Sequence, residues 1–357
     1  MIWSRPHEEK KEAVPQDLEA VRASFLAETW PLPSCAQRGG GRGRRVTPAP
    51  RSVLDELGRP AFGTYTGHVP RIRWRQGGLR SKRWHFVSVS GGHVLAAAAV
   101  VDLSWATMGF AYVFDRRRRR LIREVSRFGL PLLSGRVSER PGAGSRSEFV
   151  GPGLWLSLTR PEDSSSWRWR VRASGLRVEA LLEETVEPLC AIAPIDGGLA
   201  NCTHKTVCLP SRGFAESDGA RFDLEGCWGA LDHTLGVLAR ETRWHWASMS
   251  GTGLGLNLVE GFNGYRENAV WIRGQVHPLG EAEFELDREE PSSPWRIRTR
   301  DGAVDVRFTP EGIRREDKEL GFAKSRFVQA IGSFAGTALG VDFRDIPGVT
   351  EDHEARW

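Results

Sequence analysis

Short runs of β-branched, aromatic and other apolar residues follow one another along the chain from Gly63 onward, separated by Gly, Pro, Ser and Asp. Such runs occupy residues 84–89, 95–103, 110–114, 154–158 and 167–171, and the same texture returns at 253–259, 269–273, 295–300 and 304–308. Runs of this length, bounded by turn residues, are typical of antiparallel strands. We therefore predict a mostly β protein with no long helix after the first 60 residues.

Residues 1–60 lack this texture and form a predicted N-terminal extension. Residues 17–26 carry Leu18, Val21, Phe25 and Leu26 at helical spacing, which predicts a short helix. The prolines that follow, and a Gly/Arg-rich tract at 39–45, interrupt regular structure. The extension is expected to be partly disordered, with one short helical segment.

An internal repeat divides the rest of the chain into two related parts. Residues 80–91 (RSKRWHFVSVSG) recur at 240–251 (RETRWHWASMSG), 160 residues later, with seven identities in twelve positions. Each copy is followed by a Gly-rich turn and an apolar strand that carries an acid, Asp102 in the first and Glu260 in the second. A period this long is too great for a solenoid and indicates a duplicated domain. We predict a first β module at 61–195 and a second at 196–357.

Alternation within the repeated strand separates its side chains onto two faces. Trp84 lies on one face and His85 on the other, while in the second copy Trp244 and Trp246 share the first face and His245 lies on the second. Each module is expected to carry a histidine beside a tryptophan on a buried strand. Such a histidine is either a structural residue with a polar partner or a general acid or base at a pocket wall, because its pKa lies near neutrality.

The composition fits two β modules with tryptophan-rich interiors. A length of 357 residues suits two domains, and an apolar content of 40% is enough for packed cores. The 14 tryptophans are suited to half-buried β surfaces and to apolar cavities.

Cysteine usage and the N-terminal residues indicate a cytoplasmic location. Five cysteines are an odd and sparse set for this length, which argues against a disulfide scaffold and for a reducing compartment. The N-terminus lacks the apolar stretch of a signal peptide. The longest apolar run, residues 94–101, is too short to span a bilayer and fits a buried strand. We expect a cytoplasmic protein without a transmembrane segment.

The formal charge of +5 comes largely from local arginine runs, at 38–45 and 116–120. Such runs are either solvated loops or contacts with nucleic acid or an anionic surface. Aromatic residues, on which single-stranded bases would stack, are not interleaved with either run. This pattern disfavours nucleic acid as a partner and leaves peripheral membrane contact open.

The second module places several polar residues within or beside its predicted strands. These residues are Asp232, His233, His245, Asn257, Glu260, Glu267 and Asn268. A carboxylic acid set against tryptophan in a dry pocket has a raised proton affinity and can protonate a substrate. Residues of these types serve equally to satisfy strand ends and turns, and the sequence does not show whether they converge.

Two further patterns resemble a zinc site and a phosphate-binding loop but lack residues that these sites require. Cys202, His204, Cys208 and Cys227 lack the CxxC pairing of a zinc site, so no metal is expected. The glycines at 251–255 (GTGLG) indicate a hairpin turn, because neither the helix nor the lysine of a phosphate loop follows. No cofactor is expected.

Many short motifs, in order, resemble those of one family. They are GCWGALD (226–232), RWHWAS (243–248), GLNL (255–258), ENAVW (267–271), PW (294–295), FTP (308–310), GSFAG (332–336), GV (348–349) and RW (356–357), with KRW (82–84) and VDL (101–103) in the first module. Over about residues 60–357 the chain resembles the domain of unknown function 2804 family, from which no activity can be carried over.

That family is distantly similar to carotenoid 1,2-hydratase and AttH-like proteins. The resemblance implies two tandem lipocalin-like (calycin-like) antiparallel β-barrel or sandwich modules. Relatives of that fold hydrate or cyclise hydrophobic polyenes in a cavity lined by aromatic residues and an acid. Because fold does not fix function, the resemblance supplies an analogy only.

Together these patterns favour a protein that binds a hydrophobic, lipid-like or isoprenoid-like small molecule in a tryptophan-rich β cavity. Carrier and enzyme both remain open. An enzyme would catalyse acid-assisted hydration, isomerisation or cyclisation, with Glu260, Glu267 or Asp232 as the proton donor and His245 as a relay.

The expected ligand-binding residues come from both modules. Trp244, Trp246 and Trp271 would shield a carbocation by cation–π contact. Asn257 and Asn268, and in the first module Trp84, His85 and Asp102, complete the expected set. The alternatives are a non-catalytic module that binds nucleic acid or anionic lipid through its arginine-rich loops, and a structural protein with two filled barrels. The oligomeric state is not predicted.

Overall fold

A computed structural model describes residues 46–75, 77–196, 199–319 and 321–357. Within these ranges the chain consists of strands and connecting turns, with one 3-10 turn, η2, at Gly78–Arg80. The prediction of a mostly β protein is thereby confirmed. The expected helix at 17–26 and the arginine tract at 39–45 lie outside the described residues. Residues 46–60 of the expected extension are described, and they include β1 (Thr47–Pro48), which pairs with β2 (Gly63–Thr66).

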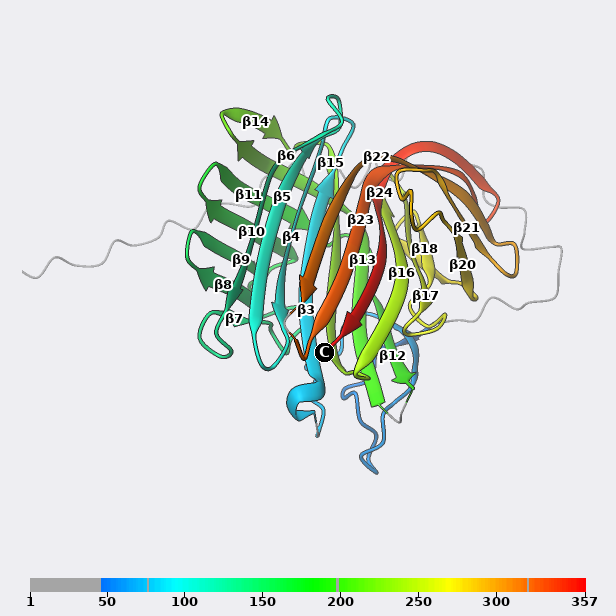
Figure 1. Cartoon of the computed structure of the whole chain (residues 1–357). Helices are drawn as coiled ribbons and strands as arrows, with labels where there is room; N and C mark the ends of the chain where they lie inside the picture. Colours follow the sequence, from blue (N-terminus) through cyan, green and yellow to red (C-terminus); the bar gives the residue numbers. More distant parts are fainter. Residues whose placement is uncertain (1–45, 76, 197–198, 320) are drawn as a thin grey trace, which may run out of the picture. The chain divides into compact units, whose positions relative to one another are not determined.

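The strands form two antiparallel sheets (Figure 1). The first sheet follows the order β6, β5, β4, β3, β15, β13, β11, β10, β9, β8, β7, with β1, β2, β12 and β14 attached beside it. Its main strands are β3 (Ser81–Ser90), β4 (Val94–Asp102), β5 (Thr107–Asp115), β6 (Arg120–Gly129), β7 (Gly135–Arg136), β8 (Ser145–Gly151), β9 (Leu154–Arg160), β10 (Ser166–Ala173), β11 (Leu176–Glu183), β12 (Leu189–Ile195), β13 (Leu199–Ser217), β14 (Ala220–Asp223) and β15 (Cys227–Val237).

The second sheet follows the order β19, β18, β17, β16, β24, β23, β22, β21, β20. Its strands are β16 (Glu241–Ser250), β17 (Leu254–Gly261), β18 (Ala269–Ile272), β19 (Gln275–Pro278), β20 (Ala282–Glu285), β21 (Trp295–Thr299), β22 (Val304–Glu319), β23 (Lys324–Ala338) and β24 (Val341–Arg356). Its concave side buries Trp295, Phe308 and Phe334 in one apolar cluster.

The first sheet curls into a nearly closed barrel, because its two ends pack against each other. Phe149 of β8 lies against β5 at Gly109, where a Cβ atom would stand only 2.5 Å from the ring. Glycine at this position therefore lets the aromatic side chain fill the seam between strands that are not hydrogen-bonded to each other.

Burial on one or both faces explains the two kinds of strand in the sequence. In β10 the buried Trp167, Trp169 and Val171 alternate with exposed arginines, so one face meets the core and the other meets water. In β4 the apolar run of residues 94–101 is buried on one side inside the barrel and on the other beneath the second sheet. The loss of alternation there follows from burial on both faces.

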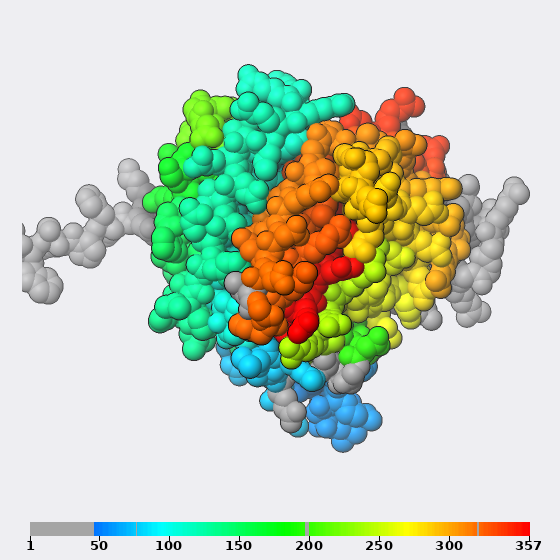
Figure 2. All heavy atoms as spheres, viewed as in Figure 1, coloured from blue at the N-terminus to red at the C-terminus, as the bar shows by residue number. Residues whose placement is uncertain are grey.

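The two sheets pack directly on each other. Figure 2 shows the orange strands β22 and β23 lying beside the blue-green strands β5 and β6. Gly312 of β22 makes this approach possible, since a Cβ atom there would lie 2.3 Å from Phe114. A second apolar cluster, which includes Phe86, Tyr112, Trp246 and two alanines of β4, fills the interface.

The repeat in the sequence corresponds to a repeat in the sheets. Strands β5, β4, β3, β15 and β13 follow one another in the first sheet as β18, β17, β16, β24 and β23 do in the second. The repeated segments form β3 and β16. The chain passes from one sheet to the other between Val237 and Glu241, whereas the sequence divides the modules at 195/196. This difference arises because β13 and β15 pair with β11 and β3 of the first sheet.

Candidate functional site

An apolar cavity of about 160 Å³ lies between the two sheets. Its aromatic lining consists of Trp84, Phe86, Trp105, Phe110, Phe128, Trp244, Trp246, Phe262, Phe327 and Trp357. The repeated strands β3 and β16 face each other across it. Trp84 stacks on Trp244 with ring centroids 6.0 Å apart, and Phe86 meets Trp246 edge to face at 5.7 Å. The space far exceeds what one water molecule occupies, and its walls suit an apolar ligand.

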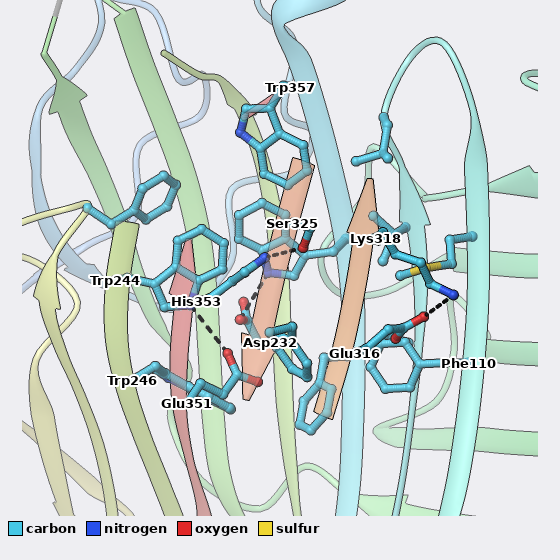
Figure 3. Close-up of a pocket in the computed structure, with 18 of the residues that line it drawn as sticks. Phe110, Asp232, Trp244, Trp246, Glu316, Lys318, Ser325, Glu351, His353 and Trp357 are labelled. Atoms are coloured by element: carbon cyan, nitrogen blue, oxygen red, sulfur yellow. Dashed lines mark hydrogen bonds and ion pairs between the residues drawn. The ribbon is translucent and has the colours of Figure 1, made fainter. Parts of the chain in front are cut away.

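Two acids occupy equivalent positions in the two halves of the cavity. Asp232 of β15 pairs in register with Phe86 of β3, and Glu351 of β24 pairs with Trp246 of β16. Because Phe86 and Trp246 correspond in the repeat, the two acids correspond as well. Figure 3 shows both carboxyl groups pointing into the same space beside Trp244.

Asp232 is held as one member of a buried ion cluster. Its Oδ2 atom lies 2.7 Å from the Lys205 Nζ atom and accepts a hydrogen bond of 3.1 Å from the Trp84 indole N–H. Its Oδ1 atom accepts hydrogen bonds from the hydroxyl groups of Thr203 and Thr234. With its acceptor sites filled by donors and a cation, this carboxylate is well satisfied in spite of its burial.

Lys205 also binds a second acid, Glu267, whose Oε2 atom lies 3.1 Å from the Nζ atom. Burial lowers the pKa of Lys205, but the carboxylates of Asp232 and Glu267 outweigh this effect and raise it above its ordinary value. Burial raises the pKa of Glu267, and Lys205 offsets only part of that rise. Two acids thus share one cation at the cavity wall.

Glu351 has neutral neighbours instead. Its Oε1 atom accepts a hydrogen bond of 2.7 Å from the Gln329 amide, and its Oε2 atom accepts one of 3.3 Å from the Trp244 indole. The Tyr112 hydroxyl donates to Gln329 at 2.6 Å and fixes that amide. Burial, reinforced by repulsion from Asp232, raises the pKa of Glu351 to about 7. Glu351 can therefore hold and release a proton near neutral pH.

His353 stands two residues further along β24, against the same tryptophan. Its ring meets Trp244 at 4.2 Å, and its Nε2 atom hydrogen-bonds the Ser325 hydroxyl at 2.9 Å (Figure 3). Burial lowers the pKa of His353 to about 3, so this imidazole is neutral around pH 7. It contributes a neutral hydrogen-bonding group to the cavity wall and no positive charge.

The cavity opens at the end where β22 turns into β23. The exposed members of its lining, Phe128, Lys324 and Arg356, mark this opening. Deeper inside, the fully buried Arg314 lies over the Phe110 ring at 4.4 Å and binds Glu124 and Glu316 at 2.7 and 2.6 Å. Apart from its charged residues and the neutral polar side chains of Asn263, Ser325 and His353, the cavity is lined by aromatic and aliphatic side chains.

Five residues expected from the sequence to form the site meet in this cavity. They are Asp232, Glu267, Trp84, Trp244 and Trp246. The roles of these residues remain proposals. The sequence predicted a cavity within the β modules, whereas this cavity lies between the two sheets and takes its tryptophans from both repeated strands.

Glu260 and His245 lie on the opposite side of the second sheet. The His245 Nδ1 atom is 2.7 Å from Glu260, and its Nε2 atom is 3.3 Å from Asp352. Burial lowers the pKa of His245, but these two carboxylates outweigh it and raise the pKa. Asp352 also binds Arg288 and Arg326. This network borders the concave core of the second sheet, where His245 contacts Phe284.

The remaining expected ligand-binding residues support the walls without lining the cavity. Asn257 accepts a hydrogen bond of 2.8 Å from the Trp246 indole and so orients that ring. Asn268 bonds the backbone of Val259, and the Trp271 indole donates to the Glu187 carbonyl.

Two expected residues of the first module also lie outside the lining. Asp102 accepts a hydrogen bond from the Ser104 backbone N–H at the turn after β4. His85 points into the first barrel, where its Nδ1 atom hydrogen-bonds Ser147.

The interior of that barrel holds a row of imidazoles. His204, His233 and His85 pair in register on the adjacent strands β13, β15 and β3. Cys190, Cys202 and His204 form a group whose ligand atoms lie within 4.8 Å of one another. The His204 Nε2 atom accepts the Val69 N–H, which leaves Nδ1 as the protonated nitrogen. In this arrangement the imidazole does not offer a free lone pair to a metal ion.

The arginine run at 116–120 forms the turn between β5 and β6 with its first four residues and begins β6 with Arg120. Arg116 is buried and binds Glu311 at 2.6 Å and the Gly91 carbonyl at 2.8 Å, so it serves the packing of the two sheets. The exposed arginines that follow it remain solvated side chains of a tight turn, in which Arg119 has a φ of 49°.

Sequence reasoning missed Lys205, Gln329 and Glu351. All three lie on strands outside the recognised repeat, and their place at the cavity follows from the pairing of β13 with β15 and of β23 with β24. One signal was present: the residue pair Asp-His occurs at 232–233 and again at 352–353. The two copies do not occupy equivalent positions in the sheets. Asp232 pairs with Phe86, and the residue that pairs with the equivalent Trp246 is Glu351, one position before Asp352.

Comparisons with known proteins give a family and a fold. A family model described as "Domain of unknown function (DUF2804)" matches residues 44–357. A comparison with curated proteins finds no match. Among the described residues, no helix is long and apolar enough to cross a membrane.

Three solved structures are similar to this chain. Kievitone hydratase from Nectria haematococca has a TM-score of 0.50 and 10% identity, covering 77% of this chain and 88% of its own. CghA has a TM-score of 0.51 and 9% identity, with the same coverage of 77% and 88%. An AttH-like protein from Nitrosomonas europaea has a TM-score of 0.49 and 12% identity, covering 78% of this chain and 92% of its own. At these identities the likeness to kievitone hydratase and CghA shows the fold, and it confirms the double lipocalin-like architecture.

Proposed function

The chain belongs to the DUF2804 family, and from its cavity we propose that it binds a hydrophobic, lipid-like or isoprenoid-like small molecule between its two sheets and transforms it by acid catalysis. The observation that carries this proposal is Glu351, a carboxyl group with a pKa of about 7 buried in an aromatic cavity. An acid that remains protonated near neutral pH can donate its proton to an apolar substrate.

The proposed first step is proton transfer to a carbon–carbon double bond. Glu351 donates its proton to one carbon, the π bond breaks, and the neighbouring carbon becomes a cation. The faces of Trp84, Trp244 and Trp246 stabilise this cation through their quadrupoles. The acidic side chains of Asp232 and Glu267, at the wall of the same cavity, stabilise it electrostatically.

The second step discharges the cation. Attack by water, with loss of a proton from the water oxygen to the Glu351 carboxylate, gives hydration. Loss of a proton from an adjacent carbon to the same carboxylate gives isomerisation. Attack by a second double bond closes a ring and moves the cation to the far carbon of that bond, and loss of a proton from a carbon beside it to the carboxylate completes cyclisation. Each route returns a proton to Glu351 and needs no further reactant except the water of the first. The dry walls of the cavity favour a substrate without charge near the reacting carbons.

The solved structure of kievitone hydratase, by its name, belongs to a hydratase with a similar fold. At 10% identity this likeness supports the plausibility of a hydration on such a scaffold and says nothing of the substrate.

The first experiment is native mass spectrometry of the purified protein followed by organic extraction and identification of any bound molecule. We expect a co-purified apolar compound, or its product, bound at one molecule per chain. Incubation of the wild-type protein with that compound should convert it, and the Glu351→Gln variant should be slower by at least about 100-fold, the usual contribution of a general acid.

Two variants control this experiment. Glu354→Gln changes a partly exposed acid of the same strand that binds Arg288, and it should retain turnover. Glu260→Gln tests the proton donor expected from the sequence. Loss of turnover in Glu260→Gln with full turnover in Glu351→Gln would contradict the assignment. If the protein binds the compound tightly but converts none of it at any pH, the protein is a carrier and the proposed catalysis is wrong.

A further inference from the structure

An exposed apolar loop stands beside the open end of the cavity. The turn between β6 and β7 carries Leu130, Leu132 and Leu133, whose exposed fractions are 64%, 95% and 79%. The Ser134 N–H donates to the Leu130 carbonyl at 3.1 Å, and the Leu130 N–H donates to the Ser134 hydroxyl at 3.1 Å, so the turn is closed. Leu132 at its tip has a φ of 65°, which is unfavourable for a leucine. Leucines exposed in this way add little to the core and point to a contact outside the chain.

Hydrogen bonds and ring contacts connect this loop to the cavity. The Thr107 hydroxyl donates to the Leu130 carbonyl at 3.3 Å. Two residues before Thr107, Trp105 lines the cavity and meets the exposed Phe322 edge to face at 5.1 Å. Phe128, at the end of β6, is part of the lining and is itself 37% exposed. The apolar loop is thus continuous with the wall of the opening.

A further leucine joins this surface from η2, directly before β3. The Lys82 ammonium donates to the carbonyl of Leu79, which is exposed, and to that of Leu103, which lines the cavity. We define the mouth patch by these exposed apolar side chains: Leu79, Phe128, Leu130, Leu132, Leu133 and Phe322. Figure 1 places the start of β3, the turn between β22 and β23 and the C-terminus at the same end of the sheets.

Cationic side chains flank the mouth patch. Lys318, Lys324 and Arg356 all border the cavity at this end, and Arg80 follows Leu79 on the surface. Glu316 lies 3.2 Å from Lys318 and is largely buried, while Glu319 lies 4.0 Å from Lys324. Cations surrounding exposed leucines complement a surface that is apolar within and anionic at its boundary.

We propose that the mouth patch docks this protein on the surface of a bilayer that contains anionic lipids. The leucines enter the boundary between headgroups and acyl chains, and the lysines and arginines meet the headgroup phosphates. The reason for such docking rests on the proposed function. A hydrophobic ligand is concentrated in bilayers, and a cavity that opens on the docked face exchanges it without a passage through water.

The test is co-sedimentation of the full chain with vesicles of phosphatidylcholine and with vesicles of equimolar phosphatidylcholine and phosphatidylglycerol. We expect binding to the anionic vesicles, weakened by added salt because exposed charges are screened. The Leu132→Ser/Leu133→Ser variant should bind at least about tenfold more weakly, since burying one leucine in hydrocarbon changes a partition coefficient by about that factor. The matched Leu132→Met/Leu133→Met variant keeps the apolar surface and should bind as the wild type does.

Charge is tested separately. Lys318→Gln/Lys324→Gln should weaken binding to the anionic vesicles by about fivefold or more per lysine, as expected for cations at a negative lipid surface. The control Arg117→Gln/Arg118→Gln removes two arginines from the turn between β5 and β6, at the other end of these strands. It should leave vesicle binding unchanged, and loss of binding in that control would show that the arginine run and not the mouth patch contacts the lipid.

Absence of binding to both vesicles, or equal binding by the serine variant, would overturn the proposal. A dimer that the serine variant converts to a monomer would show that a second copy covers the leucines. Failure of the docking proposal is distinguished from failure of the proposed function by a second measurement, the binding of the apolar fluorophore N-phenyl-1-naphthylamine in vesicle-free buffer. The serine variant should bind the fluorophore normally, whereas a cavity that takes up no apolar probe would refute the proposed function and leave the docking result as it stands.

Discussion

The two halves of the cavity are built from equivalent strands, yet their acids have opposite surroundings. Asp232 is paired with a lysine, and Glu351 in the equivalent position is paired with an amide. The partners are themselves equivalent, because Lys205 stands beside Asp232 in β13 as Gln329 stands beside Glu351 in β23. Exchange of one cation for one neutral side chain thus gives the two equivalent acids of a duplicated framework different surroundings, and Glu351 in the half without the cation has a raised pKa.

On the opposite face of the same strands, equivalent histidines of the two sheets also have different partners. His85 of the first sheet has His233 as its register partner, and the rings lie 4.7 Å apart. In the second sheet the equivalent His245 has Asp352 as its partner, at 3.3 Å. Burial lowers the pKa of His85, whereas the carboxylates beside His245 raise its pKa. The first barrel therefore keeps neutral imidazoles where the second sheet keeps an ion pair.

The largest difference in stability should appear when the hydrogen-bonding partners of the two acids, Lys205 and Gln329, are replaced. Lys205→Met leaves the carboxylates of Asp232 and Glu267 buried without a cation, and we expect a loss of about 3–5 kcal/mol in the free energy of unfolding at pH 7. Gln329→Met removes the hydrogen bond to Glu351 and leaves the buried Tyr112 hydroxyl without its acceptor, so it should cost about 1–3 kcal/mol. Urea denaturation measures both. Equal losses would mean that the two halves do not differ in charge.

Glu351 should impose its own pH dependence on stability. Its pKa is about 7 in the folded protein, against an ordinary value of 4.5. The folded state holds the proton more tightly, so this contribution is complete below pH 4.5 and is lost as the pH rises through 7. The difference amounts to about 3 kcal/mol. The Glu351→Gln variant should lack it, which urea denaturation of both proteins at pH 5 and 8 would show. Parallel profiles for the two proteins would contradict the raised pKa.

The histidines should respond to acid in opposite ways in the two sheets. Burial lowers the pKa of His233 to about 4 from its ordinary value of 6.5. The unfolded state therefore binds the proton more tightly, and about 3 kcal/mol of stability, present above pH 6.5, is lost as the pH falls to 4. Imidazole NMR should find His233 titrating below 6.5 and His245 titrating above it. A midpoint for His245 below that of His233 would reverse the comparison.

The smallest effect should come from the two stacked tryptophans. Trp84→Phe and Trp244→Phe each remove one indole hydrogen bond to an acid, and each should cost about 1 kcal/mol in the free energy of unfolding. The Trp244 N–H favours the carboxylate form of Glu351, so Trp244→Phe should raise the pKa of Glu351 further, while Trp84→Phe should leave it close to 7. Titration of the two variants tests this difference. An identical shift in both would show that the indole contact plays no part.

The fold was accessible from the sequence because its signals are local. Alternation in the repeated strands predicts which side chains share a face, and the structure places Trp244 and Trp246 on one face of β16, where both line the cavity. The same alternation already separates His245 from Trp244, so a site that combines both was inconsistent with the strand geometry. Glu260 pairs with His245 in register and follows it to the other face.

The candidate site was accessible only in part, because it depends on contacts between distant strands. Asp232 and Glu267 could be chosen from the sequence as acids near tryptophan. Their shared cation, Lys205, comes from the middle of a long strand that carries no motif of its own. Glu351 reaches the cavity only because β24 pairs with β16, and these two strands are separated by some hundred residues of sequence. Alternation within one strand does not specify which strand will become its neighbour.

The most direct measurement is a carbon-13 NMR titration of the Glu351 carboxyl group in protein labelled at glutamate, with the signal assigned by its absence in Glu351→Gln. A midpoint near pH 7 would establish a protonated acid in the aromatic cavity at neutral pH, as the neutral surroundings of Glu351 predict. A midpoint near the ordinary value of 4.5 would show an ionised carboxylate there and contradict the acid on which the proposed chemistry depends.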